Sequence, residues 1–112
     1  MSTTREGRRR VVVTGIGAVT PIGLSAGEFW ENSLAGKSGA GIIKSFDAGQ
    51  YDTKIACEVK GFNPLDFIDK KTINRMDLFT QYAMACAEMA VKDSCLNLEK
   101  EDRERIGVIF GS

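Results

Sequence analysis

The sequence predicts an α/β fold, because two strand-like apolar runs flank a long amphipathic helix. The first run, Val11 to Val13, has three β-branched residues with no polar alternation, and the second occupies residues 106–110. Such runs are typical of strands that are buried on both faces of a sheet. The helix expected between them extends from about residue 75 to about residue 94. Strands and helices in this order indicate a sheet covered by helices.

The first strand, expected over residues 9–15, leads into a glycine-rich turn. Gly15-Ile16-Gly17 matches the first half of the G-x-G-x-x-G/A fingerprint of dinucleotide-binding folds. The third position of that fingerprint falls on Thr20, directly before Pro21, where close packing of a helix on the strand needs a small residue. A nucleotide site is therefore disfavoured, and the helix is expected to begin later.

Capping residues place that helix. Ser25 and Glu28 have the spacing of a capping box, which predicts a helix over residues 25–35. A segment rich in Gly and Ser follows over residues 36–52, and this composition is typical of a loop.

Two further elements precede the long helix. Apolar and polar residues alternate over residues 53–60, as in a half-buried strand. Asn63-Pro64 combines a capping residue with proline at the first helical position, which predicts a short helix to about Ile68. The long helix has one apolar face rich in small residues: Phe79, Tyr82, Ala83, Cys86, Ala87, Ala90 and Val91. A neighbouring backbone could approach this face closely.

Composition excludes several classes of protein. The 112 residues are 43% hydrophobic and 27% charged, with 15 basic and 15 acidic side chains. This balance gives no indication of a nucleic-acid or membrane partner. No apolar run approaches the roughly 20 residues that span a bilayer, and no secretory signal is expected. The three cysteines have no paired spacing, which favours reduced thiols and a cytoplasmic location.

The order of several short motifs resembles that of one enzyme family. The motifs are V-V-V-T-G-I-G-A-V-T-P-I-G at residues 11–23, Leu34 to Gly39, Phe46-Asp47, Lys60 to Pro64, Arg75 to Asp77 and Ile106 to Ser112. In this order and at this spacing they resemble the opening of the β-ketoacyl-acyl carrier protein synthases, most nearly the synthase II type. The resemblance extends from about Arg8 to Ser112 without an evident gap.

The resemblance implies a thiolase-like fold, a layered α/β sandwich of two similar halves that forms a homodimer. Family chains are much longer, so residues 1–112 are expected to be the N-terminal portion of a β-ketoacyl synthase N-terminal domain, with a short flexible arm at residues 1–7. The family elongates acyl chains by decarboxylative Claisen condensation of an acyl-enzyme with malonyl-acyl carrier protein. Its only prosthetic arm is the pantetheine of the carrier protein, so no cofactor is expected. Two alternatives stay open: a truncated, non-catalytic α/β module that at most binds acyl carrier protein, and part of a related polyketide ketosynthase.

The catalytic groups of such an enzyme are not expected in this stretch. Condensation needs a cysteine thiolate and histidines or a comparable acid and base, and the chain has no histidine. The family's Thr-Ala-Cys nucleophile motif would lie beyond Ser112. Cys57, Cys86 and Cys95 are interpreted as structural, because free cysteine usually behaves as a small buried apolar residue. No cluster has metal-ligand spacing, so no catalytic, cofactor-binding or metal-binding residue is assigned.

A basic segment is the candidate functional site. Lys70, Lys71 and Arg75 lie within six residues, just before the long helix. If the segment is helical, Lys71 and Arg75 share a face. Charge clusters of this kind are usually only solvated surface. The family resemblance, however, implies that these residues dock the acidic helix of acyl carrier protein. Asn74 stands where a close relative has Arg, which implies one basic contact fewer.

A second departure from the family lies at the end of the long helix. The family commonly has Asp-Ser-Gly or Asp-Ala-Gly where this chain has Asp93-Ser94-Cys95. Glycine adopts the left-handed conformation that follows many helices at little steric cost. Cys95 is therefore expected either to strain this turn or to end the helix differently.

Overall fold

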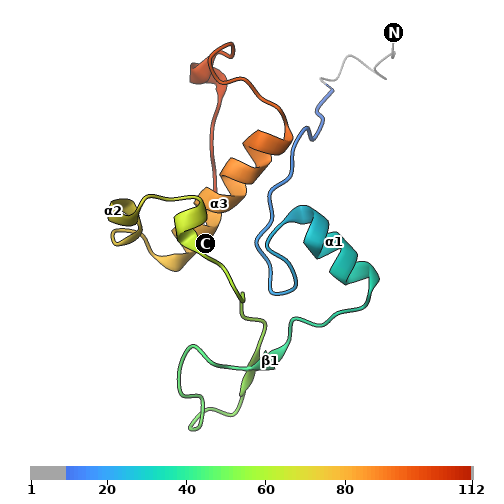
Figure 1. Cartoon of the computed structure of the whole chain (residues 1–112), viewed down its shortest axis with the longest axis vertical. Coiled ribbons are helices and arrows are strands. Elements are labelled where there is room, and N and C mark those ends of the chain that lie inside the picture. The colour runs from blue at the N-terminus through green and yellow to red at the C-terminus, as the bar shows by residue number, and fades with distance from the viewer. Residues whose placement is uncertain (1–9, 112) are drawn as a thin grey trace.

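The first apolar run is extended but belongs to no sheet. The computed structural model describes residues 10–111, and the arm expected at residues 1–7 lies outside this range. Residues 10–19 form an irregular, extended trace that passes beside the long helix (Figure 1). The Val11 side chain is 89% exposed. The prediction of a strand over residues 9–15 is therefore wrong for the described part of that range.

The second apolar run is also extended and unpaired. Residues 106–110 form no strand, and the Ile109 side chain is 97% exposed. A strand needs a neighbour that supplies hydrogen-bonding partners along its edge. The sheet found within residues 10–111 is a pair of short strands elsewhere in the chain, so neither run has a partner. The prediction of a strand at residues 106–110 is wrong for this chain.

Helix α1 (Ala26–Leu34) lies where its capping residues predict it. The Ser25 Oγ accepts a hydrogen bond of 3.2 Å from the N–H of Glu28. The Glu28 carboxylate reaches back to the N–H of Leu24 at 2.7 Å, one residue before the cap. The capping box is thus present, with its second bond displaced by one residue.

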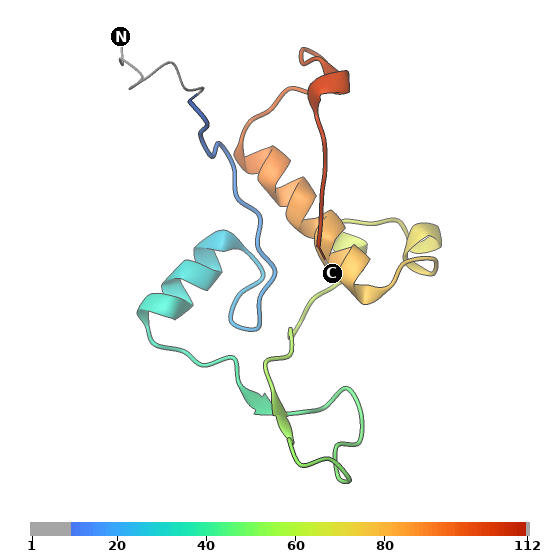
Figure 2. The same ribbon diagram turned by 180° about the vertical axis from the view of Figure 1, so that it is seen from behind.

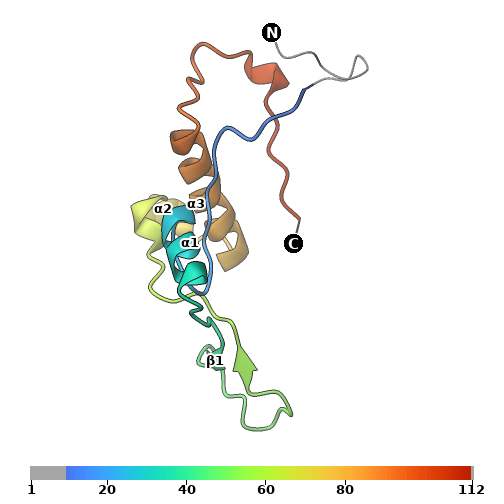
Figure 3. The ribbon, with the colours of Figure 1, turned by 90° about the vertical axis from the view of Figure 1, so that its right-hand side faces the viewer.

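A small β-hairpin projects away from the helices (Figure 3). Strands β1 (Gly41–Ile42) and β2 (Ile55–Ala56) are antiparallel, with Gly41 opposite Ala56. The strand predicted over residues 53–60 is confirmed over only two residues. Its partner β1 lies in the segment predicted as a loop over residues 36–52. The prediction missed this strand because two residues are too few to show a periodicity.

The second half of the chain is helical. Its elements are the 3-10 turn η2 (Pro64–Asp66), the one-turn helix α2 (Lys70–Ile73), the long helix α3 (Leu78–Asp93) and the 3-10 turn η3 (Arg103–Arg105). The short helix predicted after Asn63 is confirmed as a 3-10 turn, and the Asn63 side chain accepts from the N–H of Leu65. Helix α3 begins at Leu78, because Asp77 is still extended and forms its N-cap.

Two glycines bring the N-terminal segment into contact with the backbone of α3. A Cβ atom at Gly15 would collide with the carbonyl oxygen of Ala90, and one at Gly17 with that of Cys86. Any side chain at these positions would push the segment off the helix. The close backbone approach expected from the small residues of α3 is therefore confirmed.

Helix α3 ends in a left-handed residue. Cys95 has a φ of 54° and is the one non-glycine residue with positive φ within residues 10–111. The Ser94 hydroxyl donates to the carbonyl of Val91 at 2.8 Å and accepts from the N–H of Leu96 at 3.2 Å. Of the two expectations for Cys95, the strained turn is the one found.

The described chain is open, and most of its large apolar side chains face solvent. Its radius of gyration is 18.2 Å, whereas a compact domain of this length has about 13 Å. Its accessible surface is 9668 Å², whereas a folded protein of this mass has about 6,000 Å². Among the described residues, the buried hydrophobic side chains are Ala48, Ile68 and Ala85. In Figure 2, α1 and α3 lie on opposite sides of the N-terminal segment.

Candidate functional site

The basic segment predicted as the candidate site is exposed and directly precedes α3. Lys70 and Lys71 form the first half of α2, and Arg75 lies beyond its end. All three side chains are exposed. The condition for Lys71 and Arg75 to share a helix face is not met, because α2 ends at Ile73 and Asn74 is its C-cap. The three cations instead follow one helical turn and the bend after it (Figure 1).

Asp69 caps this turn. Its Oδ1 accepts hydrogen bonds from the N–H of Lys71 at 3.0 Å and from the N–H of Thr72 at 3.1 Å. Its Oδ2 accepts from the Thr72 hydroxyl. The hydroxyl first, and then these N–H groups, hold the pKa of Asp69 below its ordinary value. Sequence reasoning missed Asp69, although an aspartate directly before a helical turn is a capping signal.

Aromatic and apolar contacts anchor the segment on its N-terminal side. Ile68, one residue before the cap, is only 6% exposed. The ring of Phe62 stacks on that of Phe67 with centroids 6.1 Å apart, and meets the ring of Tyr82 edge-on at 4.9 Å. Because Tyr82 belongs to α3, this cluster attaches the start of the segment to the long helix. Burial among these rings raises the pKa of Tyr82.

A side chain of α3 holds the other end of the segment. The Gln81 Nε2 donates a hydrogen bond of 3.0 Å to the carbonyl of Met76, in a partly buried position. Met76 directly follows Arg75, so the bend that carries this cation is tied to the first turn of α3. The sequence carries no signal for this bond, because an isolated glutamine on a helix has many possible partners.

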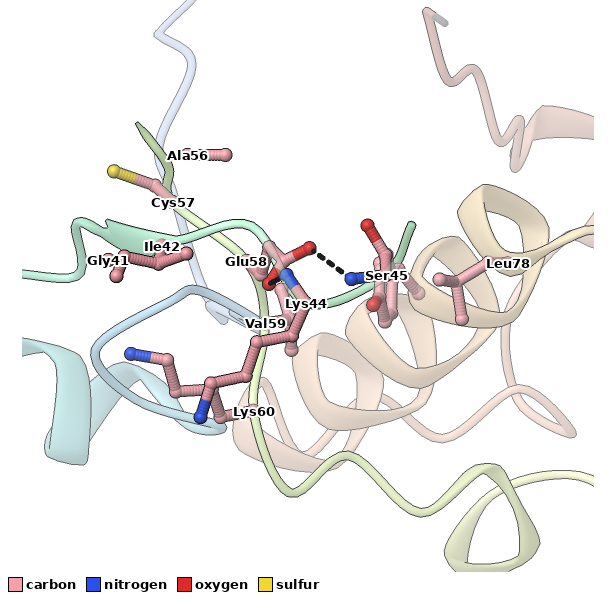
Figure 4. A pocket seen from close by; sticks show the side chains of 11 residues that line it. Gly41, Ile42, Lys44, Ser45, Ala56, Cys57, Glu58, Val59, Lys60 and Leu78 are labelled. Carbon is pink, nitrogen blue, oxygen red and sulfur yellow. Dashed lines mark hydrogen bonds between the residues drawn. The ribbon is translucent and has the colours of Figure 1, made fainter. Parts of the chain in front are cut away.

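A second candidate is an open depression of about 840 Å³ beside the hairpin (Figure 4). The Glu58 carboxylate at its wall accepts hydrogen bonds from the N–H groups of Lys44 and Ser45, both at 3.0 Å. Hydrogen bonds from Ser45 and then Lys44 lower the pKa of Glu58, so this carboxylate is a weak base. The Cys57 thiol points away from Glu58 (Figure 4). The thiol and this carboxylate therefore do not form a pair of nucleophile and base.

The cysteines are less buried than predicted. All three are free thiols, but Cys57 and Cys95 are exposed and only Cys86 is half-buried, in α3. The expectation of small buried side chains is wrong for Cys57 and Cys95, because the open chain leaves their surroundings uncovered. Within residues 10–111, no three side chains of metal-ligating type are grouped as a metal ion would need. None of the helices in that range is long and apolar enough to cross a bilayer.

Comparisons with known proteins identify the family. Residues 8–112 match the family model described as the N-terminal domain of beta-ketoacyl synthase. The chain is 44% identical over 105 residues to the 3-oxoacyl-[acyl-carrier-protein] synthase 2 of Coxiella burnetii (strain RSA 493 / Nine Mile phase I). The aligned residues make up 94% of this chain and 25% of that protein. The chain is 47% identical over 104 residues to the protein of the same name from Staphylococcus aureus (strain COL), covering 93% of this chain and 25% of that protein. The chain thus spans about a quarter of the length of these relatives.

A solved structure supports the same assignment. The ishigamide ketosynthase/chain length factor matches with a TM-score of 0.76 and 40% sequence identity, over 83% of this chain and 23% of that one. Most of the backbone therefore follows the course of a ketosynthase. The chain belongs to the β-ketoacyl synthase family, and its elements are an incomplete N-terminal part of a thiolase-like α/β fold.

Proposed function

We propose that this chain is the N-terminal quarter of a 3-oxoacyl-[acyl-carrier-protein] synthase 2. The complete enzyme would elongate acyl chains in fatty-acid synthesis by decarboxylative condensation of an acyl-enzyme with malonyl-acyl carrier protein. The observation that carries the proposal is the 44–47% identity to synthases of that name over more than nine tenths of the chain. The exposed apolar runs support it, because they are typical of strands whose neighbours lie elsewhere in a larger fold.

Within that enzyme, this quarter would supply scaffold and a binding surface, and the catalytic groups would lie elsewhere. The sequence has no histidine, and its cysteines lie in a hairpin, in the middle of a helix and at a helix C-terminus. None of these positions is a helix N-terminus, where a thiolate would be stabilised. We therefore expect the chain alone to be inactive in condensation and acyl transfer.

The binding surface would be the basic segment. Lys70, Lys71 and Arg75 are exposed and lie on a turn that is anchored at both ends. An acidic helix of acyl carrier protein is complementary to such a surface in charge. We further propose a cytoplasmic, homodimeric enzyme without a cofactor of its own, which takes its acyl groups from the pantetheine arm of the carrier protein.

A second candidate is a polyketide-type ketosynthase. The structural match to the ishigamide ketosynthase/chain length factor favours it, since that protein is 40% identical to this chain. Both candidates use the same condensation chemistry and differ in the product they release. A chain of 112 residues that functions only as a binding module remains the non-catalytic alternative.

The test uses the complete enzyme expressed from the reading frame that contains this sequence. It is incubated with an acyl-acyl carrier protein and malonyl-acyl carrier protein, and the products are identified by mass spectrometry. A 3-oxoacyl thioester two carbons longer than the substrate supports the synthase. Repeated extension without reduction supports the polyketide candidate, and absence of any condensation contradicts both. In parallel, the 112-residue chain should leave Cys57, Cys86 and Cys95 unacylated.

A further inference from the structure

We propose that Asp69 is a positioning residue for carrier-protein binding, whose carboxylate orders the one-turn helix α2 that presents Lys70 and Lys71; this inference rests on the proposed function. Asp69 carries the wrong charge to contact an acidic partner. It is nevertheless exposed and directly precedes Lys70. The negative charge of the Asp69 carboxylate weakens the positive potential of this surface. A carboxylate at this position therefore needs a structural explanation.

The geometry supplies that role. The carboxylate accepts three hydrogen bonds, from the N–H groups of Lys71 and Thr72 and from the Thr72 hydroxyl. The Lys71 N–H is a backbone donor that the start of a helix leaves unpaired, and the carboxylate is its acceptor. The Thr72 N–H is shared between the Asp69 carboxylate and the Asp69 carbonyl oxygen, each at 3.1 Å. The Lys71 backbone is therefore held by Asp69 while its ammonium group stays available to a partner.

A turn this short depends on its cap. Helix α2 has only four residues, and a single helical turn is unstable in water because its nucleation is unfavourable. The residues on either side are fixed by other contacts, with Ile68 buried before the turn and Gln81 bound to the Met76 carbonyl after it. The part between these anchors is the part that Asp69 orders. Since apparent affinity scales with the fraction of molecules in the binding-competent form, loss of the cap should weaken docking.

Charge and capping can be separated by substitution. Asp69→Ala removes both the cap and the negative charge. Asp69→Asn removes the charge but keeps a side-chain acceptor that caps helices as well as aspartate does. Asp77→Ala is the matched control, because Asp77 is exposed, lies two residues after Arg75, and makes no side-chain capping bond although it is the N-cap of α3.

The experiment measures KM and kcat of the complete enzyme for the acyl carrier protein substrate, with hydrogen exchange at residues 69–73 as a second readout. Asp69→Ala should raise KM about three- to five-fold with little change in kcat, and should speed exchange in α2. Asp69→Asn and Asp77→Ala should leave KM at or below its original value and exchange in α2 unchanged.

Two results would overturn the inference. If Asp69→Ala lowers KM as much as Asp69→Asn does, the carboxylate acts only through its charge. If exchange in α2 is the same with and without the cap, Asp69 does not order the turn. An enzyme without carrier-dependent condensation would instead overturn the proposed function, and the exchange measurement would still decide whether Asp69 orders α2.

Discussion

The backbone N–H of Ile16 donates a hydrogen bond of 2.9 Å to the carboxylate of Asp93, across 77 positions of sequence. This bond attaches the N-terminal segment to the last turn of α3. A carboxylate at that end of a helix is disfavoured by the helix dipole, so its presence there is explained by the long-range bond. The segment is thus held by Asp93 at one point and by the close contacts of Gly15 and Gly17 with α3 at two others.

Replacement of Asp93 should therefore loosen the N-terminal segment. In the complete enzyme, Asp93→Ala removes the acceptor and should cost about 1 kcal/mol of local stability, which corresponds to roughly five-fold faster hydrogen exchange over residues 11–18. Asp93→Asn keeps an acceptor oxygen and should exchange at an intermediate rate. Equal exchange in all three proteins would show that the bond does not hold the segment.

The end of α3 should become more stable if Cys95 is replaced by glycine. Helix α1 also ends in a left-handed residue, Gly36 at φ 67°, although the N–H that follows it donates to the carbonyl of Asn32, whereas the one after Cys95 donates to the Ser94 hydroxyl. A non-glycine residue in this conformation destabilises the folded state by about 1–2 kcal/mol. Glycine removes this cost, but part of the gain is offset because glycine loses more backbone entropy on folding.

We expect Cys95→Gly to stabilise the complete enzyme by about 0.5–1 kcal/mol, seen as a higher midpoint in thermal unfolding. Gly36→Ala is the matched control, since it places a Cβ in the same conformation at α1, and it should lower the midpoint by a similar amount. A decrease in both variants would mean that the Cys95 side chain makes stabilising contacts that exceed the strain.

The 112-residue chain alone should bind a hydrophobic dye and lack a sharp unfolding transition. Its large exposed apolar side chains include Val11, Trp30, Leu34 and Ile109, and few residues are buried among those described. Large apolar side chains exposed in this number are typical of an uncovered interface and favour aggregation. Fluorescence with an anilinonaphthalene dye, compared with the complete enzyme, measures this directly. A monomer with a cooperative, reversible transition and no dye binding would contradict the prediction.

The parts of the fold that the sequence predicted well are those that depend on neighbours in the chain. Ser25 and Asn63 were expected to begin helices, and both cap them, because a capping bond reaches only two or three residues. The predictions of strands at Val11 and Ile109 were wrong, because a strand depends on a partner that lies far away in sequence or in another part of a larger fold. Local propensity identified the strand-like segments but could not supply their neighbours.

For the candidate site, the sequence indicated the basic side chains but not the residues that hold their backbone. Charge singled out Lys70, Lys71 and Arg75, which are exposed, but only the family resemblance assigned them to carrier-protein docking, and that assignment stays a prediction. The two residues that fix their backbone were missed. The capping position of Asp69 was not recognised, and the bond from Gln81 to the Met76 carbonyl depends on how the segment lies against α3.

The loop before β2 should loosen at acidic pH. Hydrogen bonds from Ser45 and Lys44 lower the pKa of Glu58 from its ordinary value of 4.5. A carboxyl group whose pKa is lower in the folded state stabilises that state above its unfolded pKa, and this contribution is lost as the pH falls through the folded pKa. In the complete enzyme, Glu58→Gln should speed hydrogen exchange over residues 43–46 at pH 7, and the difference from the original protein should vanish well below pH 4.5. A difference that persists at low pH, or one produced equally by Glu31→Gln on α1, would contradict this.

Charge reversal in the basic segment should impair use of the carrier protein more than use of a small substrate. Lys71 and Arg75 are exposed, so each would contribute only about 0.2–1 kcal/mol to docking, mainly through the association rate. Lys71→Glu with Arg75→Glu replaces attraction by repulsion, and should raise KM for acyl carrier protein several-fold. The loss should be smaller for a pantetheine thioester, which has no acidic helix.

The informative quantity is the ratio of kcat/KM for the carrier substrate to kcat/KM for the thioester, measured at low and at high salt. High salt should narrow the difference between the variant and the original enzyme, because it screens exposed charges. Lys92→Glu with Lys100→Glu is the matched control, since Lys92 lies in the last turn of α3, a helix about 24 Å long, and Lys100 lies beyond that end, whereas the basic segment precedes the first turn. An equal loss on both substrates, or an equal loss in the control, would mean that the reversal acts through the fold or through overall charge, and the docking assignment would be wrong.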